Sequence, residues 1–128
     1  MQTVEADDYT LYYHNLARLA HKSGRFDLVI TAWQNALEVN PNDDVARVHL
    51  DRELREYAEI KVSILEGEQK LVDAPDDVQT RYRLAHNYLG AGYVTEAKAE
   101  WERIAAMKQE NWSKSALKMI RKHCLSAD

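Results

Sequence analysis

Apolar residues recur at intervals of three and four positions along most of this chain, in separate stretches divided by polar turns. The first stretch places Tyr12, Tyr13, Leu16, Leu19 and Ala20 at such intervals. This spacing puts apolar side chains on one face of a helix, whereas a half-buried strand would alternate apolar and polar residues. The pattern therefore predicts an all-α protein built from amphipathic helices.

Short polar segments predict where these helices end. Gly24 supplies a permissive backbone after the first stretch, so a second helix follows a tight turn there. The segment "NPNDD" at 40–44 ends the second helix with a proline, and Asp43 or Asp44 can cap the next one. The segment "DAPDD" at 73–77 predicts the same arrangement before another helix.

The sequence also repeats itself. Gly24 and Trp33 are each followed, 68 residues later, by the same residue type, at Gly92 and Trp101. Since 68 is twice 34, a common length for helical repeats, the chain divides into three units of 34 residues. We place these units at 10–43, 44–77 and 78–111.

The first unit, "TLYYHNLARLAHKSGRFDLVITAWQNALEVNPND", resembles a tetratricopeptide repeat, a 34-residue helix-turn-helix unit. The positions that carry this resemblance are Tyr13, Leu16, Ala17, Ala20, Gly24, Phe26, Val29, Trp33, Ala36 and Pro41. The third unit agrees at Leu84, Ala85, Tyr88, Gly92, Ala97 and Trp101, although Gln109 replaces the exit proline. The resemblance implies a right-handed superhelical stack of helical hairpins.

The middle unit matches only in part. Its compatible positions are Leu50, Leu54, Ile60, Ser63, Ile64, Leu71 and Pro75, whereas Asp51, Ala58, Gly67 and Lys70 depart from the pattern. We expect two short helices here. One continuous helix over residues 44–73 is the alternative, because no glycine or proline marks a turn near Tyr57, and it would allow two chains to pair by swapping.

The remaining segments complete the expected organisation. Residues 1–8 are expected to be a flexible acidic N-terminus, and residues 9–125 a single domain. Residues 112–125 read as a final helix with Ala116, Leu117, Ile120 and Cys124 on one face. A repeat stack needs such a helix to cover its last apolar face.

Composition narrows the function. The 128 residues carry a formal net charge of −4 and one cysteine, which argues against bulk affinity for nucleic acid and excludes an internal disulfide. No apolar run approaches the ~20 residues that span a membrane, and no secretion signal is evident, so we expect a cytoplasmic protein without membrane insertion. Without catalytic motifs or metal-ligand spacings, we expect neither enzymatic activity nor a metal or other cofactor.

The resemblance also implies a binding groove, lined by the first helix of each unit. Its expected positions are Leu11, His14, Asn15, Arg18 and Lys22 in the first unit; Val45, Val48, His49 and Arg52 in the second; and Gln79, Tyr82, Arg83 and His86 in the third. Cationic and titratable residues thus recur at repeat spacing in an acidic protein. If the histidines gain charge, affinity for an acidic ligand should rise as pH falls from about 7.5 to 6.

These residues predict a non-catalytic protein–protein interaction module, a scaffold or adaptor that binds an extended acidic or C-terminal segment of a partner. Chaperone-binding relatives hold their ligand with a two-carboxylate clamp. Of the corresponding positions in this sequence, only Arg83 has the residue type of that clamp, so we do not expect binding to a chaperone tail. One alternative is that these positions are simply solvated helix faces. The other is an assembly module, which forms homo-oligomers through its middle unit and aromatic ends.

Overall fold

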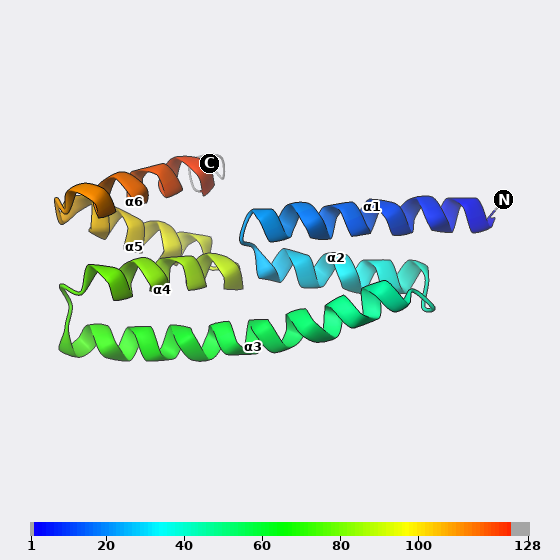
Figure 1. The fold of residues 1–128 in the computed structure, drawn as a ribbon, viewed down its shortest axis with the longest axis horizontal. Coiled ribbons are helices and arrows are strands. Elements are labelled where there is room, and N and C mark those ends of the chain that lie inside the picture. Colours follow the sequence, from blue (N-terminus) through cyan, green and yellow to red (C-terminus); the bar gives the residue numbers. More distant parts are fainter. Residues whose placement is uncertain (1, 124–128) are drawn as a thin grey trace. The chain divides into compact units, whose positions relative to one another are not determined.

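The computed structural model describes residues 2–123 as six helices, and no strand occurs among them (Figure 1). The helices are α1 (Gln2–Lys22), α2 (Phe26–Val39), α3 (Asp44–Asp73), α4 (Val78–Ala91), α5 (Val94–Ala106) and α6 (Glu110–His123). The prediction of an all-helical protein is confirmed for this part of the chain. No helix in the described range is long and apolar enough to cross a membrane.

The chain divides into two compact units, and the division falls inside α3. Unit 1 runs up to Glu59 and unit 2 begins at Ile60. Each unit has its own apolar core, one centred on Trp33 and the other on Trp101. The two units therefore partition the single domain expected over residues 9–125.

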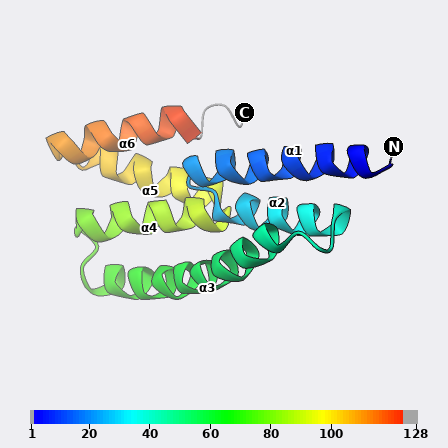
Figure 2. The same ribbon diagram turned by 45° about the vertical axis from the view of Figure 1, so that its right-hand side comes forward.

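Unit 1 consists of α1, α2 and the first part of α3, and in both views α2 lies between the other two (Figures 1 and 2). Gly24 joins α1 to α2 with a φ of 74°, a backbone conformation that glycine adopts without strain. Ala17 of α1 and Ala36 of α2 are fully buried, since small side chains let the two helices approach closely. Trp33 fills the space beside them, as its position in the repeat predicted.

Unit 2 contains the second part of α3 with α4, α5 and α6 (Figure 2). Gly92 ends α4 in the left-handed conformation, so both turn glycines of the sequence pattern have the expected role. Trp101 and Ile104 of α5 are fully buried, and α6 adds Ala116 to the same core. Asp77 caps α4 by accepting a hydrogen bond from the Thr80 amide at 3.2 Å.

The middle unit of the repeat does not form two helices. α3 is continuous for 30 residues, so the expected turn near Tyr57 is wrong and the alternative of one long helix is confirmed. In the outer units, the positions that hold a hairpin together carry small or apolar residues, such as Ala17, Val29 and Ala36, all of them buried. The equivalent middle residues, one repeat later, are Asp51, Ser63 and Lys70, and all three are exposed. Folding α3 back on itself would bury these polar groups without partners, which explains why the helix stays extended.

The helix termini also differ from the sequence-based boundaries. α1 begins at Gln2, so it includes most of the N-terminal segment that was expected to be flexible. α6 begins at Glu110, before the predicted start of the final helix at 112, and is described as far as His123. The last two residues of that predicted helix, Cys124 and Leu125, lie outside the described residues.

One predicted packing position is wrong in α1. Leu16 is 36% exposed, and its stripe neighbours Tyr12 and Leu19 are more than half exposed. The helix instead turns Ala17 and Ala20 toward α2, and residues on either side of that narrow face point outward. The spacing was correctly assigned to a helix, but the buried face is the small-residue face.

Candidate functional site

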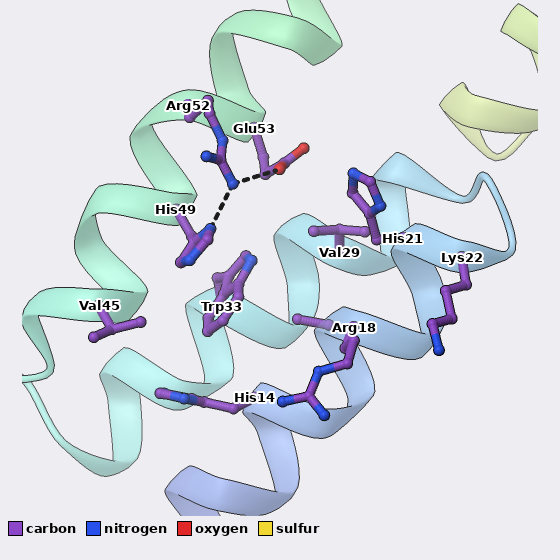
Figure 3. A pocket seen from close by; sticks show the side chains of 11 residues that line it. His14, Arg18, His21, Lys22, Val29, Trp33, Val45, His49, Arg52 and Glu53 are labelled. Atoms are coloured by element: carbon purple, nitrogen blue, oxygen red, sulfur yellow. Dashed lines mark hydrogen bonds and ion pairs between the residues drawn. The ribbon is translucent and has the colours of Figure 1, made fainter.

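The candidate site is a cavity of about 410 Å³ that lies entirely within unit 1 (Figure 3). Helices α1 and α3 supply its polar side chains, and α2 supplies part of its apolar wall. The lining residues are His14, Ala17, Arg18, His21, Lys22, Val29, Trp33, Val45, His49, Arg52 and Glu53. We call this cavity the Trp33 pocket. Its size lies within the range of about 300–1,000 Å³ typical of ligand pockets.

Aromatic contacts fix the wall around Trp33. The His49 ring stacks on the Trp33 indole with a centroid distance of 4.6 Å and an interplanar angle of 7°. The His14 ring meets the same indole edge-on at 5.0 Å. Trp33 is only 7% exposed, so it contributes a rigid wall rather than a mobile side chain.

His14 also ties α1 to the start of α3. Its Nε2 lies 2.5 Å from Oδ2 of Asp43, while the amide of Ala46 donates to Oδ1 of Asp43 at 3.0 Å. Asp43 therefore caps α3, and of the two caps that the sequence allowed, Asp43 and Asp44, it is the one used. The same carboxyl group also holds a side chain of α1. Burial raises the pKa of Asp43, but the hydrogen bonds from His14 and from backbone amides outweigh it, and the pKa is lowered overall.

His49 is held by Arg52, one turn further along α3. The Arg52 guanidinium lies 2.6 Å from Nδ1 of His49, as the dashed line in Figure 3 marks. Burial lowers the pKa of His49, and the positive charge of Arg52 lowers it further. In unit 2, burial also lowers the pKa of His86. The lowered pKa of these two histidines disfavours the positive charge on which the expected rise in affinity at lower pH depends.

Positive charge in the pocket comes from three longer side chains. The cavity lining includes Arg18 and Lys22 of α1 and Arg52 of α3. Each of these residues is also exposed to solvent. Figure 3 shows Arg18 and Lys22 on the α1 side and Arg52 across from them on α3. Among the side chains that the structure describes, none with a negative charge lies within ion-pair distance of Arg18 or Lys22. This rim can accept an anionic group.

Many of the groove residues predicted in the first two repeat units meet in this pocket. The lining includes the predicted residues His14, Arg18, Lys22, Val45, His49 and Arg52. Leu11, Asn15 and Val48 do not line it, although all three are exposed. The predicted apolar contacts from Leu11 and Val48 are therefore on the surface of unit 1 but outside the cavity.

The predicted residues of the third repeat lie in unit 2. Tyr82 and His86 are half-buried, and their rings meet edge-on at 4.7 Å beside the Trp101 core. Gln79 is exposed, and the exposed Arg83 lines a separate cavity of about 160 Å³ between the second part of α3 and α4. Tyr82 and His86 thus contribute to packing in unit 2.

Sequence reasoning missed four lining residues besides Ala17: His21, Val29, Trp33 and Glu53. Val29 and Trp33 were identified, but only as core positions. Glu53 carried a signal of its own, since it stands one repeat length after Leu19 and puts a charge where the first unit has an apolar residue. This substitution points to a functional residue only once Glu53 is known to be buried, and Glu53 is 2% exposed.

The lining of the Trp33 pocket is chemically mixed. Among the described residues, no three His, Cys, Asp or Glu side chains are arranged to hold a metal ion. The pocket instead combines an apolar wall, a cationic rim and one buried carboxyl group. Comparison with protein-family models, with curated proteins and with solved structures finds no match to this chain.

Proposed function

We propose that this chain is a non-catalytic interaction module whose Trp33 pocket binds an acidic segment of a partner protein. The observation that carries the proposal is the combination of an apolar wall at Trp33 with two cationic rim residues, Arg18 and Lys22, that form no ion pair with any described side chain. A carboxylate on the rim gains charge-assisted hydrogen bonds, and an adjacent apolar side chain gains burial against the indole. Such a division of roles is usual in peptide recognition.

We further propose that the α1–α2 and α4–α5 hairpins are tetratricopeptide-like repeats. The support is the shared register, in which Gly24 and Gly92 form the turns while Trp33 and Trp101 are buried. The middle repeat keeps the parts of this register that pack against neighbouring repeats, through Ala46 in unit 1 and Ile64 in unit 2. It has lost the parts that would close its own hairpin. A right-handed superhelical arrangement of the hairpins belongs to this proposal.

The test of binding uses fluorescence anisotropy with a fluorescein-labelled hexapeptide, Asp-Leu-Glu-Asp-Leu-Glu, whose C-terminus is amidated. We expect the wild-type chain to bind it, and the double variant Arg18→Glu with Arg52→Glu to bind at least about 100-fold more weakly, since two attractions become repulsions. The matched control is Arg55→Glu, an exposed arginine on α3 that does not line the pocket. Equal affinity of the wild type and the double variant would disprove the assignment.

Self-association is the second candidate. Two observations favour it: α3 is continuous, and α1 exposes an apolar stripe that contains Tyr9, Tyr12, Leu16 and Leu19. Closure of the middle hairpin between two chains would bury Asp51 and Lys70, which weighs against swapping. Light scattering over a range of concentrations separates the candidates. A dimer that persists on dilution, and that Leu19→Glu dissociates, would support assembly through α1.

A further inference from the structure

One carboxyl group of the Trp33 pocket is buried. Glu53 is 2% exposed, and its Oε2 has no hydrogen-bond donor within the part of the chain that the structure describes. The nearest cation, the Arg52 guanidinium, lies 3.7 Å from Oε1, which is longer than a hydrogen bond. In Figure 3 the Glu53 carboxyl group lies on the α3 side of the pocket, in the direction of His21.

Burial of this carboxyl group lowers the stability of the folded chain. A buried carboxyl oxygen without a hydrogen-bond donor destabilises the folded state relative to an apolar side chain of similar size. Burial raises the pKa of Glu53, and the nearby Glu56 carboxylate raises it further. An apolar side chain of similar size at this position would remove this cost. A buried acceptor in a cavity is instead well suited to a ligand that brings a donor.

The positive charge at the rim of the pocket limits which hydrogen-bond donors can approach Glu53. Arg18, Lys22 and Arg52 surround the opening with positive charge, so a ligand ammonium group would be repelled as it approached Glu53. A neutral N–H group meets no such repulsion. An extended peptide offers one at every residue, next to the acidic side chains that the rim attracts.

We propose that Glu53 is a specificity-determining residue of the Trp33 pocket, whose Oε2 accepts a hydrogen bond from a backbone N–H of the bound acidic segment. This rests on the function proposed above. The peptide's carboxylates contact Arg18 and Lys22, an apolar side chain contacts Trp33, and one amide faces Glu53. The pocket thereby selects a peptide whose backbone N–H lies opposite Glu53 when its carboxylates contact the rim, and not every negatively charged ligand.

The experiment is an N-methyl scan of the amidated hexapeptide, in which each derivative has one backbone N–H replaced by N–CH3. Affinities are measured by anisotropy for the wild type, Glu53→Met and Glu53→Gln. Methionine fills the space without an acceptor, whereas glutamine keeps a carbonyl oxygen. Glu38→Gln, at an exposed glutamate of α2 that does not line the pocket, is the matched control. Circular dichroism verifies that each variant is folded.

We expect one methylated position to weaken wild-type binding at least about tenfold and Glu53→Met binding less than about twofold. The unmodified peptide should bind Glu53→Met about tenfold more weakly, with Glu53→Gln and Glu38→Gln close to the wild type. A methylation profile that is the same in the wild type and Glu53→Met overturns the role of Glu53 and leaves the proposed function standing. Failure of the unmodified peptide to bind the wild type overturns both.

Discussion

Leu16 and Leu84 occupy the same position in the 34-residue repeat, yet Leu84 is 3% exposed and Leu16 is 36% exposed. The second part of α3 covers Leu84, where the Cβ position of Gly67 would lie 3.3 Å from its Cδ1. Leu16 has no such covering helix within unit 1. The same side chain in the same register is thus core in one unit and surface in the other.

This contrast predicts unequal effects of the same substitution. Leu84→Ala should lower the free energy of unfolding by about 2–5 kcal/mol, because it removes buried methyl groups and leaves a cavity. Leu16→Ala should lower it by less than about 1 kcal/mol. Urea unfolding followed by circular dichroism measures both. Equal losses would mean that Leu16 is also covered, and would contradict the exposed stripe on α1.

A second prediction concerns the continuity of α3. Ala58 stands one repeat length after Gly24 and one before Gly92, so Ala58→Gly restores the repeat's glycine. Because Ala58 is exposed inside a helix, the change should lower stability by about 1 kcal/mol, the cost of backbone entropy. A turn at this position would instead make glycine neutral or stabilising, and thermal unfolding distinguishes the two outcomes.

Glu53→Gln should stabilise the folded chain at neutral pH. The pKa of Glu53 is raised in the folded state above its ordinary value of 4.5, so the folded state holds the proton more tightly and wild-type stability falls as pH rises from there. We expect a gain of about 1 kcal/mol or more at pH 7.5, which shrinks toward pH 4. Melting temperatures across this range test it, with Glu38→Gln, at an exposed glutamate, for comparison. A destabilised variant at pH 7.5 would show that Glu53 contributes to the fold.

His49 should make the chain less stable in mild acid. Its pKa is lowered in the folded state, so below its ordinary value of 6.5 the unfolded chain binds the proton first and stability falls with pH. His49→Phe keeps a ring against Trp33 but cannot titrate. The loss of stability between pH 7 and 5 should therefore be smaller in this variant than in the wild type. Parallel profiles would remove His49 from this account.

Some features followed from the sequence because they depend on neighbouring residues along the chain. Helical spacing predicted the helices, and Gly24 and Gly92 marked turns because only glycine enters the left-handed region without strain. Asp43 was one of two candidate caps, since a side chain three residues before a free amide can reach it.

Other features depended on whether another helix packs against a given face, and the local sequence pattern carries no information about that partner. The three exposed polar residues of the middle repeat explain the extended α3 only once the buried equivalents in the outer hairpins are known. Leu16 and Leu84 have the same local sequence signal and opposite burial, because burial requires a partner helix. Glu53 read as a charge at an apolar position, and only the folded unit showed its carboxyl group enclosed beside Trp33 without a donor. The sequence determined where helical segments and glycine turns lie, whereas the tertiary structure decided that the middle repeat forms one helix and which helix faces are buried.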